Sequence, residues 1–132
     1  MSEILIDTSV WIEFFHHPNS SAGAMTDLLL GEGRVCTTPL VMVEVISGAG
    51  NRAEFKRLQT DFKALPRVEP SVTVWEEMIE TRWQLKMRGV SGVSIPDLLI
   101  ALTASAHEKV LFTLDKVFWR MKPILNLKLI EL

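Results

Sequence analysis

The chain has 132 residues, of which 48% are hydrophobic and 23% are charged, with a formal net charge of −2 at pH 7. This length fits a single domain over residues 1–132, because domain sizes commonly peak at about 100–150 residues. No apolar run approaches the ~20 residues that cross a bilayer, and a basic region followed by a long apolar run is absent from the start of the chain. We therefore expect a cytoplasmic protein. Any binding of nucleic acid must use a local basic patch, because the overall charge does not favour it.

A short apolar run at residues 4–6 ends in Asp7, and Thr8 and Ser9 follow before the apolar pattern resumes at Val10. This pattern predicts a buried parallel strand that turns into a helix and delivers Asp7 to the carboxyl edge of a sheet. Ligands and chemistry in open α/β sheets lie at that edge. Asp7 is therefore the first candidate site residue.

A second predicted strand, residues 34–37, contains the chain's single cysteine, Cys36. This cysteine cannot form an internal disulfide, and its sequence neighbours offer no group that would lower the pKa of its thiol. We expect a buried, unreactive thiol.

Glu44 lies in the middle of an almost wholly apolar predicted helix that begins at Pro39. We expect this helix to be buried on most faces, so Glu44 needs a cationic partner, because an unpaired buried carboxylate costs several kcal/mol. That partner is either a metal ion or a nearby arginine.

A long helix is predicted over about residues 71–88, after an amphipathic helix over residues 51–65. On the long helix, Trp75 and Trp83 either pack in the core or form an exposed aromatic patch that binds a partner.

Two further acids stand at the starts of predicted helices. Asp97 lies in a first turn that Ser94 can cap, where the helix dipole favours a carboxylate, so by itself it is explained as a capping residue. Asp115 follows an apolar strand that ends at Thr113, and it could serve as an N-cap. With short strands expected near residues 67–69 and 128–130, the alternating elements predict an α/β fold with a mostly parallel sheet of about five strands, covered on both faces.

Each of the four acids has a local explanation, but one shared site explains all of them together. Oxygen ligands without histidine or cysteine select hard cations such as Mg²⁺ or Mn²⁺. Such ions activate water and stabilise the charge of a phosphoryl transition state. The chemistry that fits best is phosphodiester hydrolysis.

Four segments carry a resemblance to a known family: residues 6–11 (IDTSVW), 39–44 (PLVMVE), 95–101 (IPDLLIA) and 112–115 (FTLD). In this order they resemble the PIN-domain family, in particular the VapC-like ribonuclease toxins of toxin–antitoxin pairs. The resemblance implies a three-layer α/β/α PIN-like fold and a Mg²⁺- or Mn²⁺-dependent endoribonuclease. It also implies an RNA substrate and inhibition by a cognate antitoxin.

By position, the resemblance assigns the acids Asp7, Glu44, Asp97 and Asp115 to the catalytic metal site. It makes Ser9 and Thr113 candidates for orienting a ligand or a water. The family often has a second aspartate two residues after the position of Asp115, where this chain has Val117. This departure leaves open whether one or two cations bind.

An acidic site repels phosphate unless cations surround it, so we expect basic side chains to steer the RNA. The candidates are Arg82, Lys86, Arg88, Lys116 and Arg120. We also expect a homodimer, because four Trp, six Phe and six Met are more large apolar side chains than one small core readily hides.

Two alternatives remain. A receiver-like phosphorylation switch would need an acidic pair directly after the first strand, where this chain has Thr8 and Ser9. In a non-catalytic PIN-like interaction module, the four acids would be helix caps and ion pairs.

Overall fold

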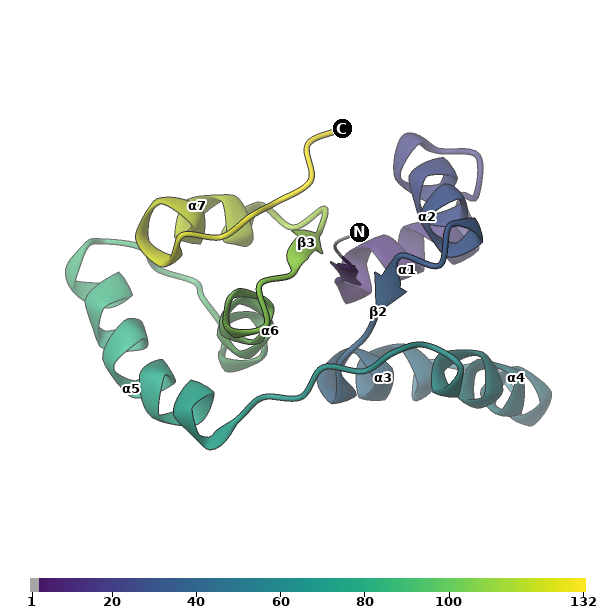
Figure 1. Ribbon diagram of the computed structural model, residues 1–132, viewed down its shortest axis with the longest axis horizontal. Helices are drawn as coiled ribbons and strands as arrows, with labels where there is room; N and C mark the ends of the chain where they lie inside the picture. Colours follow the sequence, from purple (N-terminus) through teal and green to yellow (C-terminus); the bar gives the residue numbers. More distant parts are fainter. Residues whose placement is uncertain (1–2) are drawn as a thin grey trace.

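The computed structural model describes residues 3–132, so the first two residues of the predicted domain lie outside it. The elements within that range are β1 (Ile4–Ile6), α1 (Thr8–His16), α2 (Ser21–Gly31), β2 (Val35–Cys36), α3 (Pro39–Ile46), α4 (Arg52–Lys63), α5 (Val72–Met87), α6 (Ile95–Ala106), β3 (Val110–Phe112) and α7 (Lys116–Leu125). The strands lie at the centre, with α2 and α7 on one side and α3 and α6 on the other (Figure 1). Across the described range, no helix has both the length and the apolarity needed to span a membrane.

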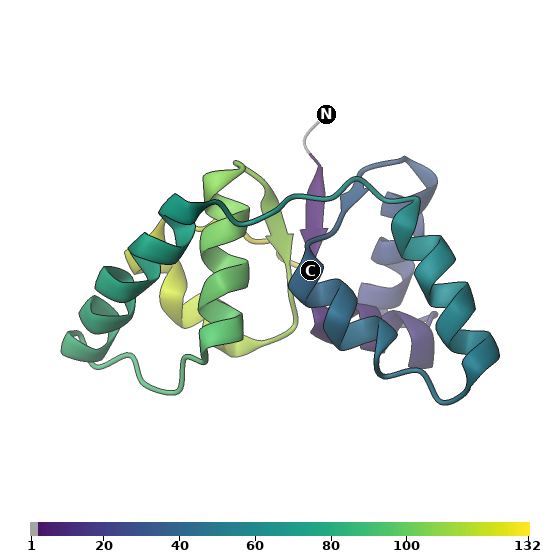
Figure 2. The same ribbon diagram turned by 90° about the horizontal axis from the view of Figure 1, so that it is seen from below.

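The sheet has the order β2-β1-β3, and both pairs of neighbouring strands are parallel. Single parallel bridges extend it on each side, from Thr37 to Arg67 and from Leu111 to Leu129. The predicted sheet of about five strands therefore consists, within residues 3–132, of three strands and two flanking segments held by one bridge each. Figure 2 shows the strands running downward, so their carboxyl ends lie on the same side as the connection from α5 to α6.

The three strands are buried on both faces, which explains why their sequences are continuously apolar. Leu5, Ile6 and Phe112 are fully buried at the centre of the sheet. Helix residues such as Leu98 in α6 and Phe118 in α7 are equally inaccessible and complete the core around the strands.

The prediction that the helix containing Glu44 is buried on most faces is wrong. In α3, Val41, Val45 and Ile46 are buried, whereas Val43 is 62% exposed and Glu44 is also exposed. The helix packs against α1 and α4, and the part of its surface that carries Val43 and Glu44 is left in contact with solvent. Glu44 therefore does not need the buried cationic partner that its apolar neighbours suggested.

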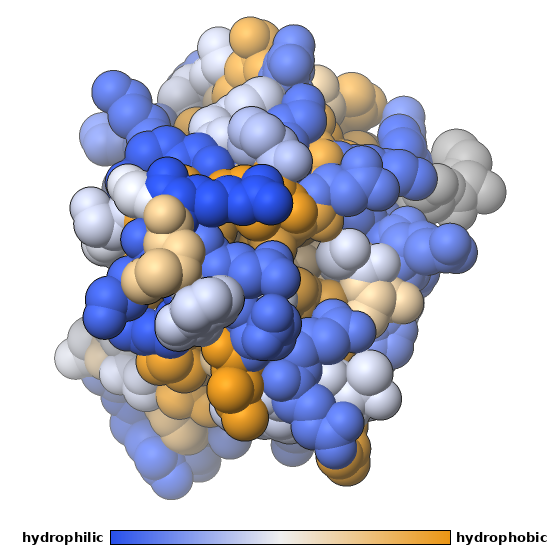
Figure 3. Space-filling model, turned by 90° about the vertical axis from the view of Figure 1, so that its left-hand side faces the viewer, coloured by the Kyte–Doolittle hydropathy of each residue, from blue (hydrophilic) through white to orange (hydrophobic). Residues whose placement is uncertain are grey.

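Helix α5 is apolar on more than one face, and both of its tryptophans are exposed. Val74, Met78 and Leu85 are buried, whereas Trp75 and Trp83 are 50% and 58% exposed. Figure 3 shows the side of the molecule on which α5 lies, where apolar surface is open between hydrophilic side chains. The structure thus favours the exposed aromatic patch over core packing for these two residues.

Cys36 lies in β2 with no exposed surface, and burial, aided by the negative charge of Glu3, raises the pKa of its thiol to about 11. At pH 8 almost none of it is thiolate, the reactive form. We expect the folded protein not to react with a disulfide reagent such as DTNB at this pH, and to react fully after unfolding in guanidinium chloride. Rapid labelling of the folded protein would contradict the buried position of β2.

Candidate active site at the carboxyl edge of the sheet

Asp7 is the buried centre of this edge. It is the N-cap of α1 and only 5% exposed. Its Oδ2 accepts hydrogen bonds from the hydroxyls of Ser9, at 2.7 Å, and Thr113, at 2.9 Å. Among the described residues, no hydrogen bond reaches Oδ1. One carboxylate oxygen is thus fixed by the protein, and the other is left for a ligand.

The same two hydroxyls also fix the chain beyond β3. Ser9 Oγ accepts a hydrogen bond from the backbone N–H of Leu114, at 3.0 Å, and Thr113 Oγ1 accepts one from the N–H of Asp115, also at 3.0 Å. The two hydroxyl oxygens are 3.4 Å apart. The structure therefore brings both predicted hydroxyl residues together against Asp7 and ties Asp115 to the same network.

Asp115 occupies the N-cap of α7, where its Oδ1 accepts a hydrogen bond from the N–H of Val117 at 3.1 Å. This is the capping geometry that the sequence suggested. Because Asp115 is exposed, capping uses one of its oxygens without removing the carboxylate from solvent.

Asp97 comes to the site from a third element, in the first turn of α6. The cap of this helix is Ser94, whose Oγ accepts the N–H of Asp97 at 3.1 Å. Burial raises the pKa of Asp97, the negative charges of Asp115 and Asp7 raise it further, and hydrogen bonding with Ser94 opposes them. The three aspartates therefore lie close enough to share one electrostatic field.

Glu44 is at the rim of the site rather than in its centre. Its Oε1 accepts a hydrogen bond from the hydroxyl of Thr8, at 2.8 Å, so α3 is linked to the first turn of α1 beside Asp7. The part of the chain that the structure describes contains no ion pair to Glu44. The sequence did not single out Thr8, and the available signal was its position directly after Asp7 at the start of a helix.

The arrangement does not form a ready-made metal cage. Within residues 3–132, no three carboxylate, imidazole or thiol side chains are close enough together to hold one ion as they stand. Mg²⁺, however, usually binds through one or two carboxylates and keeps several waters. The oxygen-only donors and the open Oδ1 of Asp7 fit a hydrated hard cation.

The five predicted RNA-steering side chains are all exposed. Arg82 and Lys86 line a cavity beside α5, and Arg88 is the C-cap of that helix. Lys116 begins α7, and Arg120, one turn later, donates to the backbone carbonyl of Ser91 at 2.8 Å. None of the five forms an ion pair with another described residue. All five lie on α5 or α7 or at the ends of these two helices.

Comparison with known proteins identifies the family. A model of the PIN domain matches residues 4–122, which is most of the chain. The chain belongs to the PIN-domain family. The match spans all four acids of this PIN domain, so the predicted resemblance and fold class are confirmed.

Individual relatives agree with this assignment. Ribonuclease VapC51 of Mycobacterium tuberculosis is 30% identical over 114 residues, which cover 86% of this chain and 81% of that protein. A structure of VapBC-1 from nontypeable Haemophilus influenzae matches with a TM-score of 0.76 and 21% identity, over 97% of this chain and 96% of that one. A DNA-bound VapBC from Salmonella typhimurium matches with a TM-score of 0.75 and 18% identity, over 98% of each chain. At these identities the two structures show the fold alone.

The raised pKa of Asp97 predicts a pH-dependent loss of stability. Its favourable contribution is fully present below the ordinary pKa of 3.8 and is lost as pH rises through the higher pKa of the folded state. In EDTA, Asp97→Asn should therefore be more stable than the wild type at neutral pH, and the difference should vanish below about pH 4. Urea unfolding across this pH range measures it.

The matched control is Asp61→Asn, which removes an exposed carboxylate from α4 and should follow the wild-type profile. Parallel profiles for Asp97→Asn and the wild type would show that Asp97 does not share the field of Asp7 and Asp115.

Proposed function

We propose that this PIN domain is a metal-dependent endoribonuclease that hydrolyses RNA phosphodiester bonds and acts as the toxin of a toxin–antitoxin pair. The observation that carries the proposal is the convergence of Asp7, Asp97 and Asp115 from three different elements, with two of these charges raising the pKa of the third. The ribonuclease name of the Mycobacterium tuberculosis relative supports the reaction. The VapBC complexes among the similar structures support an antitoxin partner.

Asp7, Asp97 and Asp115 would hold Mg²⁺ or Mn²⁺, with Glu44 completing the set of acids from the rim. Carboxylates without histidine or cysteine ligands suit these hard cations. A bound ion of this kind supplies a water of lowered pKa and offsets charge that develops on the phosphoryl group.

The chain's own contribution is to fix the carboxylates before substrate arrives. Ser9 and Thr113 hold Oδ2 of Asp7, so the carboxylate cannot rotate freely and presents Oδ1. Thr8 holds Oε1 of Glu44, which leaves Oε2 to accept a proton or a hydrogen bond from a water at the rim. Holding both groups in advance lowers the entropic cost of reaching the reactive geometry.

Val117 bears on the number of cations. It is 5% exposed, packs in the core and donates its backbone N–H to Asp115. A buried apolar side chain at this position contributes no ligand. We therefore propose one firmly held cation and a second, weaker site.

The alternative is a non-catalytic PIN-like interaction module. The observation in its favour is that no three potential metal ligands in the described range are close enough together to hold an ion as they stand. The receiver-like alternative loses its support, because the family match covers residues 4–122.

Replacing Asp7 tests the reaction. Asp7→Asn keeps the size of the side chain and can still cap α1, but it loses the charge that a cation needs. We expect Mn²⁺-dependent cleavage of single-stranded RNA by the wild type and none by Asp7→Asn. Mn²⁺ at 100 times its dissociation constant should add about 2.7 kcal/mol to wild-type stability and less to the variant.

Asp61→Asn again serves as the control and should retain both cleavage and the Mn²⁺ shift. Cleavage that persists in EDTA or in Asp7→Asn would favour a contaminating nuclease or the non-catalytic module.

The proposed partners are an RNA substrate, a cognate antitoxin protein and a second copy of the chain, in the cytoplasm. The homodimer is supported by an apolar ridge on α5, formed by Val72, Ile79, Trp83 and Met87. These side chains follow one another along the helix and are 56–78% exposed. Burying such a ridge against another copy would remove a large apolar surface from water.

Ile79→Glu places a charge at the centre of the ridge, at the residue that is 78% exposed, so the folded monomer should keep its stability. We expect a dimer for the wild type and a monomer for the variant, measured by light scattering at tens of micromolar. A wild-type monomer at these concentrations would refute the dimer.

A further inference from the structure

A cavity of about 750 Å³ lies between α5 and the segment of residues 89–95, which we call the α5 cavity. Its volume falls in the range of roughly 300–1,000 Å³ that is usual for small-molecule sites. The walls are mainly apolar. Trp75, Met78 and Leu85 line it from α5, and Val93 and Ile95 line it from the other side.

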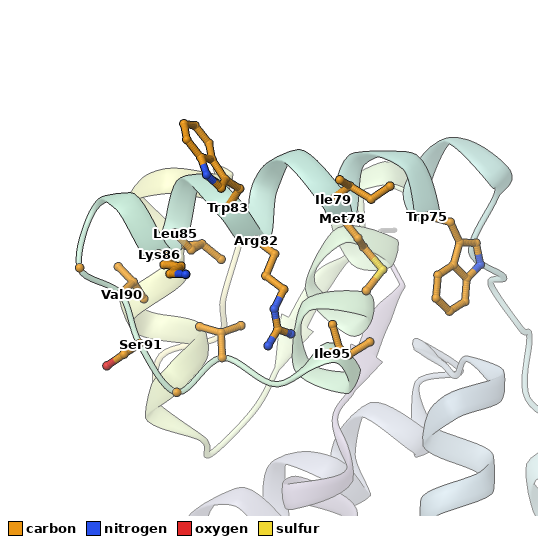
Figure 4. A pocket seen from close by; sticks show the side chains of 13 residues that line it. Trp75, Met78, Ile79, Arg82, Trp83, Leu85, Lys86, Val90, Ser91 and Ile95 are labelled. Atoms are coloured by element: carbon orange, nitrogen blue, oxygen red, sulfur yellow. The ribbon is translucent and has the colours of Figure 1, made fainter.

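The cavity and the apolar ridge are neighbouring surfaces of α5, because Ile79 and Trp83 of the ridge also line the cavity. In Figure 4, Arg82 extends from the helix toward Ile95 with Met78 beside it, and Trp75 points to the same side. Trp83 projects to the other side of the ribbon from Arg82 in this view, and it too is part of the lining (Figure 4). The cavity thus combines an exposed indole ring and a guanidinium, the groups that stack on a nucleobase and pair with its phosphate.

The charge of the cavity favours an anion. Arg82 and Lys86 are its only charged side chains among the described residues that line it, and neither forms an ion pair within residues 3–132. The acids of the same helix, Glu76, Glu77 and Glu80, are not part of the lining. A chain with a net charge of −2 therefore has a locally cationic cavity.

The cavity adjoins the acidic edge of the sheet. Ile95 is the first residue of α6, two positions before Asp97. On the other side, Arg120 of α7 donates to the carbonyl of Ser91 at 2.8 Å, and α7 begins directly after Asp115. Figure 2 shows the α5–α6 connection on the side of the sheet where the strands end. A chain that crosses the acids can reach the cavity over the first turn of α6.

We propose that the α5 cavity binds one unpaired nucleotide of the RNA substrate, with its base against Trp75 and its phosphates on Arg82 and Lys86. The inference rests on the proposed ribonuclease function and adds where the substrate is held beside the reacting phosphate. It makes Trp75 a residue that selects single-stranded over paired RNA, because only an unstacked base exposes the face that an indole can cover.

A protein helix is the competing occupant. An apolar helix laid into the cavity would remove Arg82 and Lys86 from water without a partner charge, which is costly, whereas the phosphates of RNA supply that charge. A second copy of the chain on the apolar ridge would border the cavity, because Ile79 and Trp83 belong to both surfaces.

Binding is measured in the Asp7→Asn background, so that cleavage does not consume the RNA. The probe is a fluorescein-labelled single-stranded RNA of roughly 12 nucleotides, read by anisotropy. Trp75→Leu should raise the dissociation constant at least about five-fold, the loss expected for one stacked base. Arg82→Gln with Lys86→Gln should lower the slope of log K against log salt by roughly 1.4, for two phosphate contacts on a single strand.

The matched control is Lys56→Gln with Arg57→Gln, which removes two exposed cations from α4 and should change affinity less than the α5 pair does. A series of RNAs that each lack one base completes the test. One abasic position should weaken binding to the protein with Trp75 intact and have no further effect in Trp75→Leu.

If Trp75→Leu binds every RNA of the series as tightly as its parent, or if the salt slope of the α5 pair equals that of the α4 pair, the cavity does not hold RNA. Loss of self-association or of antitoxin binding in these variants, with RNA binding unchanged, would assign the cavity to a protein and overturn the inference.

Cleavage by the wild type is assayed on the same RNA. Cleavage without these binding effects refutes the inference alone, whereas the binding effects without cleavage refute the proposed reaction.

Discussion

The buried carboxylate of Asp7, held by the hydroxyls of Ser9 and Thr113, is the contact on which the carboxyl edge depends. Burying a carboxylate is costly unless hydrogen bonds compensate it, and these two hydroxyls supply the compensation at 2.7 and 2.9 Å. They come from α1 and from the end of β3, and they also accept the backbone N–H groups of Leu114 and Asp115. One network thus fixes a functional side chain and the starts of two helices.

Placing several acids at this edge has an electrostatic cost, because their negative charges repel one another. Asp97 reaches it in the first turn of α6, where its backbone is well capped by Ser94, yet burial and the charges of Asp115 and Asp7 raise its pKa. A carboxylate in an unfavourable field lowers the stability of the fold and raises the affinity of the site for a cation. The same field repels RNA, so the cations that would attract a phosphate backbone have to lie around the acids, on α5 and α7.

Helix α5 contributes to the core, to the cavity and to the apolar ridge, and these three surfaces overlap. Val74, Met78 and Leu85 face the core and hold the helix in place. Met78 and Leu85 also line the cavity, together with Trp75 and Arg82. The exposed Ile79 and Trp83 belong both to the cavity lining and to the apolar ridge. Sixteen residues therefore combine a structural role with a cationic cavity and an adjoining apolar ridge.

The sequence by itself determined the order of the strands and helices, the capping of α6 by Ser94 and of α7 by Asp115, and the set of four acids. These features depend on residues close together in the chain, and parallel strands bring their carboxyl ends to one edge whatever the details of packing. The resemblance made Ser9 and Thr113 candidates for orienting a ligand or a water, but their contact, between residues 104 positions apart, came only from the structure.

Only the tertiary structure decided which helix faces meet solvent. The apolar neighbours of Glu44 predicted burial, but Val43 and Glu44 are exposed on α3, and the hydroxyl of Thr8 is the hydrogen-bond partner of this carboxylate. On α5 the tryptophans fit a core or a surface equally well in the sequence, since hydropathy does not specify what packs against a side chain. Burial is a property of the assembled fold, and for this reason the cavity beside Trp75 and Arg82 could not be predicted from the sequence.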